Sequence, residues 1–452
     1  MALPSPLALS LQAQVPGSLD ASVEELGGRQ VVLVRSDPTR HRGALTAPDG
    51  PTLAAAAGAA LEARVPLVAV LSTSGAEVGD GIAALHGWGQ AARALSACSG
   101  AVPVAVAMVG PAVSGPALLL GLADLVVMTP EAFAFVSGPG MVAQFTGIQV
   151  DVDGLGGPGV HATRTGLGAL QADDEDQAIE LVAQVLSHLP ANADEEPPVS
   201  PTTDPPDRPT PELREVLPDS ERGSYDVREV ARSLADDGRL VELRPRWAPQ
   251  VVTALARVEG RPVGVVANQP RTLAGTLDIA ASQKGARFVA WCDAFNLPLV
   301  TLVDTPGFLP GKDLEWRGMI RHGAELAFAY ARATVPRVAV ILRKAYGGAY
   351  IVMDSRGMGS DVCLAWPSAE VAVMGAQGAA QVLYRREDDQ TRARREAAYR
   401  DAYLTPWVAA ERGLVDAVID PAETRVAVAD ALATLATKQE HLVARKHDNA
   451  PL

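Results

Sequence analysis

Residues 334–353 read TVPRVAVILRKAYGGAYIVM, an apolar run followed by a turn of two glycines and an alanine. Within this stretch, residues 338–342 are a continuous run of Val, Ala, Ile and Leu, which is typical of a strand covered on both faces. The turn at residues 347–349 is not followed by the lysine of a phosphate-binding loop. Because glycine permits close approach and unusual backbone angles, the stretch predicts a buried strand that ends in a turn of small residues, as in α/β proteins.

The same pattern occurs earlier in the chain. VPLVAVLSTSG (residues 65–75) and AVPVAVAMVGPAVSGPALLL (residues 101–120) parallel LPLVTLVDTPG (residues 297–307) and the opening stretch. In each copy, the glycine lies nine positions after the proline in the first run and twelve positions after it in the second. From the first proline to the second glycine the separations are 49 and 50 residues. These spacings predict an internal duplication with a period too long for a solenoid, hence two copies of one α/β domain.

One segment differs in composition from the rest of the chain. Residues 190–225 are rich in proline and acidic residues and poor in apolar ones, a composition typical of a linker. We therefore expect an atypical N-terminal segment at residues 1–44, a first domain at 45–189 and, after the linker, a second domain at 226–452.

Composition excludes several classes of function. The formal net charge of −14 provides no basic field for nucleic acid. No signal-peptide pattern and no apolar stretch of about 18 residues is present, so we expect a cytoplasmic protein with no membrane span. The three cysteines are far apart, the seven histidines are scattered, and no metal-binding motif occurs, so no metal site is expected.

The two glycine turns, at residues 114–116 and 347–349, are the strongest candidates for a functional site. Each should lie at the carboxyl end of a parallel strand, where a helix begins and its first N–H groups have no intrahelical acceptor. Such amides can stabilise a developing oxyanion by roughly 3–4 kcal/mol per donor. The alternative is that the glycines only let a helix pack closely after each strand. No Ser-His-Asp or Cys-His grouping is evident, and LVDTPGFLPG resembles a GTPase segment but has no P-loop before it.

Several long motifs carry a resemblance to a known family. They are the opening stretch, RVEGRPVGVVANQP (257–270), GTLDIAASQKGARFVAWCDAFNLPLVTLVDTPGFLPG (275–311), AWPSAEVAVMGAQGA (365–379) and PWVAAERGLVDAVIDP (406–421). With these motifs the chain resembles the carboxyltransferase (β) subunits of biotin-dependent acyl-CoA carboxylases, of the propionyl-CoA and acetyl-CoA type. The first half matches more weakly, and the resemblance covers roughly residues 45–452.

The resemblance implies a fold, an assembly and a reaction. The fold would be two crotonase-like (ββα spiral) domains, and the assembly a homo-oligomer of head-to-tail dimers, often a hexamer. The reaction would move a carboxyl group from biotin, held on a separate carrier protein and recharged by a biotin carboxylase partner, to the enolate of an acyl-CoA. The product would be of the malonyl-CoA type. Biotin itself would act as the base, in keeping with the missing side-chain base.

The resemblance also assigns roles to the two turns. Gly348 and Ala349 match amides proposed to hold the biotin ureido oxygen, whereas Ser114 and Gly115 match the pair that would polarise the thioester carbonyl.

Three further residues in and beside the second turn are expected to contact substrate: Gly347, Tyr350 and Ile351. Ile351 stands where propionyl-type members carry aspartate, so an apolar wall could alter the acyl chain that is accepted. The alternative for Ile351 is ordinary packing on a helix face.

The departures from the family concentrate in the first half. Glu77 replaces an arginine, Ser114 replaces a glycine, and Pro116 follows the first turn. Three interpretations stay open: a carboxyltransferase with an unusual acyl substrate of specialised metabolism; a decarboxylase, a transcarboxylase or an enzyme with a non-CoA acceptor; and a non-catalytic assembly subunit that pairs with a complete β subunit.

Overall fold

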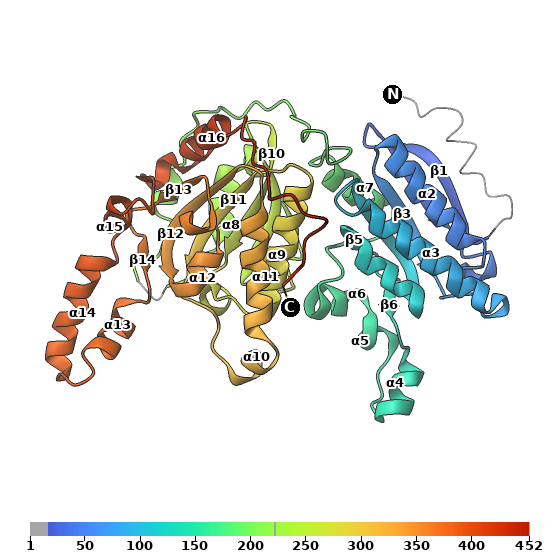
Figure 1. Ribbon diagram of the computed structural model, residues 1–452, viewed down its shortest axis with the longest axis horizontal. Helices are drawn as coiled ribbons and strands as arrows, with labels where there is room; N and C mark the ends of the chain where they lie inside the picture. Colours follow the sequence, from blue (N-terminus) through green and yellow to red (C-terminus); the bar gives the residue numbers. More distant parts are fainter. Residues whose placement is uncertain (1–16, 221–222, 452) are drawn as a thin grey trace. The chain divides into compact units, whose positions relative to one another are not determined.

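The structure is a computed structural model, and it describes residues 17–220 and 223–451. The chain divides into two compact units (Figure 1). The first comprises the residues up to Pro198 together with Arg244–Trp247, and the second comprises Val199–Leu243 and the residues from Ala248 onwards. Parts of three expected segments lie outside the described residues: 1–16 of the N-terminal segment, 221–222 of the linker, and the last residue of the second domain.

The first unit is built on a seven-stranded sheet with the order β1-β2-β3-β4-β5-β7, in which β6 also pairs with β4. Its strands are β1 (Leu19–Leu26), β2 (Arg29–Ser36), β3 (Leu67–Thr73), β4 (Val104–Val113), β5 (Leu125–Met128), β6 (Phe133–Phe135) and β7 (Leu170–Gln171). Only the pairing of β1 with β2 is antiparallel. The helices are η1 (His41–Gly43), α2 (Asp49–Ala63), η2 (Val78–Asp80), α3 (Ile82–Cys98), η3 (Gly115–Leu122), α4 (Pro139–Thr146), α5 (Val152–Gly156), α6 (Pro158–Val160), η4 (His161–Thr165) and α7 (Glu175–Leu186).

The second unit contains an eight-stranded sheet with the order β15-β13-β12-β11-β10-β9-β8, in which β14 also pairs with β12. Its strands are β8 (Val241–Leu243), β9 (Val251–Val258), β10 (Arg261–Asn268), β11 (Leu299–Thr305), β12 (Arg337–Tyr346), β13 (Val362–Ala365), β14 (Glu370–Ala372) and β15 (Ala417–Val418). The helices are η5 (Pro211–Arg214), α8 (Val227–Leu234), η6 (Asp236–Gly238), η7 (Leu273–Gly275), α9 (Ile279–Ala294), α10 (Lys312–Trp316), α11 (Met319–Arg332), α12 (Gly347–Val352), η8 (Arg356–Met358), α13 (Ala376–Leu383), α14 (Asp389–Tyr403), α15 (Pro406–Glu411), η9 (Pro421–Glu423) and α16 (Thr424–Thr434). Helices α9 and α11 pack side by side (Figure 1).

The two units repeat one another in strand register. In the first, Thr73 of β3 pairs with Ala112 of β4, and in the second, Thr305 of β11 pairs with Ala345 of β12. Both pairings are parallel and both follow a register shift. The expected α/β class and the internal duplication are therefore confirmed, since the apolar runs that predicted buried strands occupy the centre of each sheet.

A tight turn before the first long helix is also duplicated. Gly43 of η1 and Gly275 of η7 have φ angles of 72° and 74°. A Cβ atom would lie 2.7 Å from the Ser72 carbonyl oxygen at the first and 2.5 Å from the Asp304 carbonyl oxygen at the second. Glycine is needed at both because the chain approaches the end of a strand closely in a left-handed conformation.

The N-terminal and the linker-like segments both take part in the units. Strands β1 and β2 form a hairpin at the edge of the first sheet, and Val32 and Val34 belong to its core. Val199–Leu243 belong to the second unit, whose core includes Leu213 and Tyr225.

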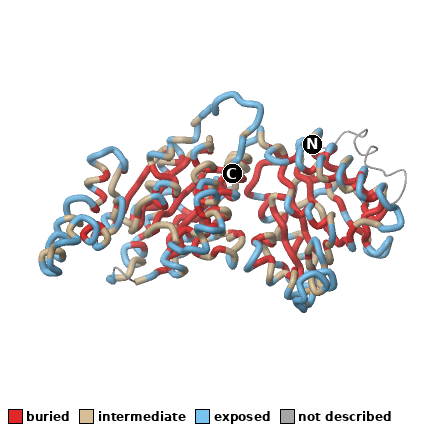
Figure 2. Tube along the Cα trace, turned by 60° about the horizontal axis from the view of Figure 1, so that its bottom comes forward, coloured by how far each residue is buried: buried red, intermediate tan, exposed pale blue. Residues whose placement is uncertain are grey.

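Buried residues follow the sheets of each unit, whereas several outer helices are exposed (Figure 2). Helices α4 and α14 contain no buried residue. Within the described ranges, none of the helices combines the length and the apolar character needed to cross a membrane.

Candidate active site

The first candidate turn lies where β4 ends and η3 begins. Ser114 has φ 65° and ψ −153°, a left-handed φ that non-glycine residues rarely adopt. Its N–H donates a hydrogen bond of 2.9 Å to the Phe135 carbonyl oxygen of β6. Pro116, the second residue of η3, has no N–H group. Among the first residues of this turn, the Gly115 N–H is therefore the amide left for a ligand.

A second amide in the first unit, that of Ala76, was missed by the sequence reasoning. Leu45 bridges the chain after β3: its N–H donates to the Gly75 oxygen at 2.7 Å, and its own oxygen accepts from the Glu77 N–H at 2.8 Å. Neighbouring residues of an extended chain point their N–H groups in opposite directions. The Ala76 N–H therefore points away from Leu45, and it has no hydrogen-bond acceptor among the described residues. A Cβ atom on Gly75 would lie 3.5 Å from the Ser114 Cβ, so this segment runs beside the turn.

The second candidate turn begins α12 at the end of β12. Gly347 has φ 59°, close to the value at Ser114. The N–H groups of Gly347, Gly348 and Ala349 lie in the first turn of the helix, where no intrahelical acceptor exists. Gly348 is exposed and Gly347 half-buried, whereas Ala349 is fully buried. Gly348 is thus the most exposed residue of this turn.

The segment after β11 repeats the arrangement of Ala76 at Phe308. The Leu277 N–H donates to the Gly307 oxygen at 3.2 Å, and the Leu309 N–H donates to the Leu277 oxygen at 2.8 Å. The Phe308 N–H, on the opposite side, has no acceptor in the described part of the chain. A Cβ atom on Gly348 would lie 3.5 Å from the Phe308 ring, so the two segments are neighbours.

The side chains next to the second turn differ in exposure. Ile351 is 44% exposed on α12 and can face a ligand. Tyr350 is 7% exposed, and burial raises the pKa of its hydroxyl group. Each group of sequence-predicted residues is therefore assembled within its own unit, with Tyr350 on the inner side of α12.

A buried ion pair supports the second turn only. The Arg343 Nε lies 3.0 Å from the Asp304 carboxylate, which is 1% exposed and also accepts from the Lys344 N–H at 3.1 Å. Burial raises the pKa of Asp304, and the charge of Arg343 opposes that rise. In the first unit the equivalent residues are Ser72 and Gly110, where a Cβ atom on the glycine would lie 2.4 Å from the Ser72 Oγ. The pair joins the ends of β11 and β12, the strands that lead to both amide segments.

Glu77 stands beside the amide of Ala76 but is engaged within the first unit. Its carboxylate accepts a hydrogen bond of 3.0 Å from the Gly79 N–H, and it lies 3.9 Å from the His41 Nδ1. Glu77 therefore places an acidic group next to the Ala76 amide in the first unit.

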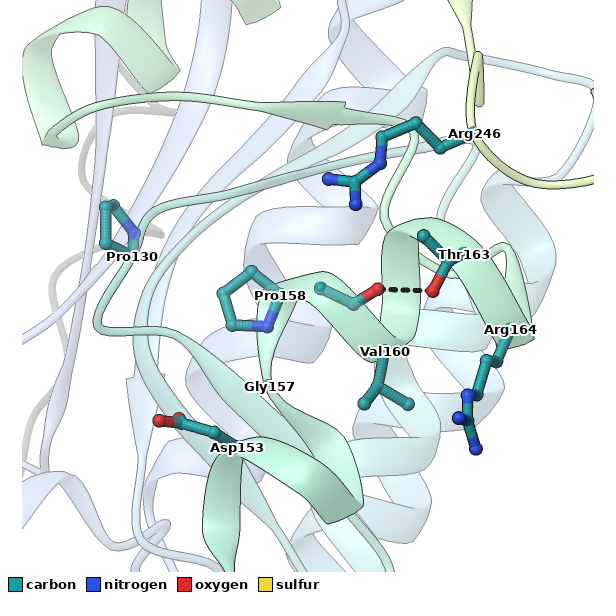
Figure 3. Close-up of a pocket in the computed structure, with 9 residues that line it drawn as sticks. Pro130, Asp153, Gly157, Pro158, Val160, Thr163, Arg164 and Arg246 are labelled. Carbon is teal, nitrogen blue, oxygen red and sulfur yellow. Dashed lines mark hydrogen bonds between the residues drawn. The ribbon is translucent and has the colours of Figure 1, made fainter.

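A separate cavity of about 580 Å³ lies within the first unit (Figure 3). Arg246 extends over it from one side and Asp153 lies on the other, while Arg164 stands at its rim. The Thr163 hydroxyl donates to the Gly159 oxygen at 2.7 Å within its wall. None of the predicted site residues lines this cavity, and its mixed charges do not select one class of ligand.

Other reactive side chains are placed unfavourably for catalysis. Burial raises the pKa of Cys98 to about 11 and that of Cys363 to about 12, which keeps both thiols protonated at neutral pH. His161 is buried between the Ala134 oxygen and the Thr165 hydroxyl, and burial lowers its pKa. Over residues 17–220 and 223–451, no group of three or more His, Cys, Asp or Glu side chains could hold a metal ion. Backbone amides are therefore the chemical groups that the two turns offer.

Known proteins resemble the whole chain. The family described as "Carboxyl transferase domain" matches residues 15–450. The propionyl-CoA carboxylase beta chain of Saccharopolyspora erythraea is 44% identical over 444 residues, covering 94% of this chain and 81% of the relative. The methylmalonyl-CoA decarboxylase subunit alpha of Veillonella parvula is 39% identical over 428 residues, covering 94% of this chain and 84% of the relative.

A solved structure has the same fold. Transcarboxylase 12S, with methylmalonyl-coenzyme A and methylmalonic acid bound, superposes with a TM-score of 0.94 at 42% identity, covering 96% of this chain and 85% of that one. This likeness confirms the expected crotonase-like fold. The chain therefore belongs to the carboxyl transferase domain family, which includes the carboxyltransferase subunits of biotin-dependent acyl-CoA carboxylases that its motifs resemble.

Proposed function

We propose that the chain is a carboxyltransferase subunit that moves a carboxyl group from biotin, on a separate carrier protein, to the α-carbon of an acyl-CoA. One observation carries this proposal: in each duplicated unit a first-turn helix amide (Gly115 or Gly348) lies beside an extended segment whose amide (Ala76 or Phe308) has no acceptor in the described residues. A carboxyl transfer between two carbonyl compounds needs two such sites, because negative charge develops on an oxygen of each partner.

On the acyl side, the N–H groups of Gly115 and Ala76 would donate to the thioester carbonyl oxygen. They would hold the charge of the enolate, which makes the α-carbon a nucleophile. The left-handed Ser114 joins β4 to η3 and has its own amide bonded to β6, so the first free amide of the turn is that of Gly115.

On the biotin side, the turn fits the ureido oxygen of the carrier's biotin. Gly348 is exposed and has no side chain, and a Cβ atom there would meet only the Phe308 ring. The Gly348 and Phe308 amides would donate to the oxygen. The buried Ala349 amide would lie next to them in the first turn of α12, and Gly347 would provide the left-handed backbone conformation of the turn. When bound, biotin supplies the carboxyl group and, in the family that the chain resembles, the base for the α-proton.

The partners follow from the reaction. A biotin carrier and an ATP-dependent biotin carboxylase would supply the charged biotin, which we place in the cytoplasm with the CoA thioester pool. The product would be of the malonyl-CoA type, and Ile351 in place of an acid favours an unusual acyl chain of specialised metabolism. The transcarboxylase 12S structure is a hexamer assembly, which supports a homo-oligomer here.

The test mixes the purified protein with a carboxylated biotin carrier and a panel of acyl thioesters, then measures carboxylated product by mass spectrometry. Product from at least one thioester, dependent on the carrier, is expected. The absence of product from every thioester would refute the proposal.

A second candidate is decarboxylation or transcarboxylation, including transfer to a non-CoA acceptor. The unequal turns favour it, because the acyl-side turn has lost an amide donor at Pro116, whereas the biotin-side turn has Ala349 at the equivalent position. One relative is named a decarboxylase subunit and the matched structure a transcarboxylase. In the same assay, carboxyl loss from the carrier without thioester product would support this candidate. No change in either carrier or thioester would instead support a non-catalytic assembly subunit.

A further inference from the structure

The Ser114 side chain has no structural role of its own. Ser114 is exposed and makes no side-chain capping hydrogen bond to η3, and its hydroxyl has no partner elsewhere in the described part of the chain. The equivalent position in the second unit is Gly347, with nearly the same φ. Since glycine adopts this conformation without steric cost, a glycine at residue 114 would also make the fold more stable. Strain kept at a turn of a candidate site points to function rather than packing.

The hydroxyl stands where the turn lacks amide donors. The Ser114 N–H is bonded to the Phe135 oxygen, and Pro116 has no N–H group. From the acyl-side turn itself, only the Gly115 amide remains. A serine at residue 114 adds a hydroxyl donor to this turn, on the residue adjacent to that amide.

We propose that the Ser114 hydroxyl is a catalytic hydrogen-bond donor to the thioester carbonyl oxygen of the acyl-CoA. This inference rests on the function proposed above and deepens its acyl side. The Oγ–H donates to the oxygen as it becomes the enolate oxygen, beside the Gly115 amide, and no bond to Oγ forms. In the described residues no histidine hydrogen-bonds to Ser114, so the hydroxyl keeps its proton and acts as a donor rather than as a nucleophile.

Three substitutions separate the hydroxyl from the rest of the side chain. Ser114→Ala removes the hydroxyl and keeps Cβ, whereas Ser114→Cys keeps the size but donates only weakly. Ser114→Gly removes both and relieves the backbone. We expect kcat for thioester carboxylation to fall about 10²-fold in all three, with KM for the acyl-CoA changed by less than about 3-fold.

Two controls show that the loss is local. Ser114→Gly should raise the Tm by about 2–4 °C although its kcat is low. Carboxyl release from the carboxylated carrier without thioester should stay at the wild-type rate in every variant, because it depends on the biotin-side turn.

Three results would overturn the inference while wild-type carboxylation is intact: wild-type kcat in Ser114→Ala, higher activity in Ser114→Gly than in wild type, or an equal loss of carrier-side release. The second would mean that Cβ obstructs the turn, and the third that the unit is damaged as a whole. If the wild-type protein carboxylates no thioester, the proposed function fails as well, and the two failures are thereby distinguished.

Discussion

The neighbouring glycines of the second turn should respond in opposite ways to the same substitution. Gly347 has φ 59°, and a Cβ atom there would lie 3.0 Å from the Val373 oxygen. A left-handed conformation costs an L-residue roughly 1–2 kcal/mol. We therefore expect Gly347→Ala to destabilise the protein by about that amount and to lower its Tm, by about 2–4 °C for each kcal/mol in a unit of this size.

Gly348→Ala should leave stability intact and remove activity. The φ of Gly348 is not in the left-handed region, and a Cβ atom would make only an ordinary contact of 3.5 Å with the Phe308 ring. Alanine is also the better helix residue, by roughly 0.5–1 kcal/mol. The added methyl group would nevertheless stand on the amide surface proposed to hold the ureido oxygen. By keeping the oxygen away from this amide, the methyl group would remove one hydrogen bond to it, which corresponds to a fall of about 10²–10³-fold in kcat.

The assay pairs thermal unfolding with carboxyl transfer from the carrier, and size-exclusion chromatography checks that the oligomer is unchanged. Wild-type turnover in Gly348→Ala would refute the role of this turn in catalysis. An unchanged Tm in Gly347→Ala would refute the reasoning from backbone strain.

Three further outcomes are expected. Arg425→Met should lower the free energy of unfolding, measured in urea, by about 3–5 kcal/mol, because Arg425 is fully buried between two carboxylates. As a control, Asp389→Asn removes an exposed ion pair and should lower it by less than about 1 kcal/mol. Ile351→Asp, on an exposed face, should leave the Tm unchanged and alter the ratio of kcat/KM between a short and a long acyl-CoA. The hydrogen bond from Arg208 lowers the pKa of Asp204 in the folded protein. Ionised Asp204 therefore stabilises the fold above pH 3.8, its ordinary pKa, and this stabilisation is lost as the pH falls through its lowered pKa in the folded state. Asp204→Asn should flatten that part of the acid-unfolding curve.

Much of the fold was predictable because its signals are local. The apolar run before the second turn is a buried strand, β12, and its counterpart before the first turn is β4. The spacing of proline and glycine in the two copies matches the shared register of the strands. Sequence patterns of this kind survive because a buried parallel strand requires apolar residues wherever it occurs.

The packing of residues 190–225 was harder to predict from the sequence. Residues 190–225 have the composition of a linker, yet Leu213 and Tyr225 pack in the second core, and the Thr210 N–H donates to the Ala422 oxygen at 2.7 Å. A few apolar residues in a proline-rich segment do not form a periodic pattern, so their partners more than 200 positions away cannot be inferred from composition.

The sequence alone determined that the protein is a duplicated α/β chain with a small-residue turn in each copy, and its motifs indicated the family. Only the tertiary structure decided which amides the turns can offer. The Ser114 N–H is taken by Phe135 of β6, and the Ala76 and Phe308 N–H groups point outward because Leu45 and Leu277 pair with the opposite side of their segments. The direction of a backbone N–H depends on which distant strand pairs with it, and that pairing is set by packing rather than by the residue itself.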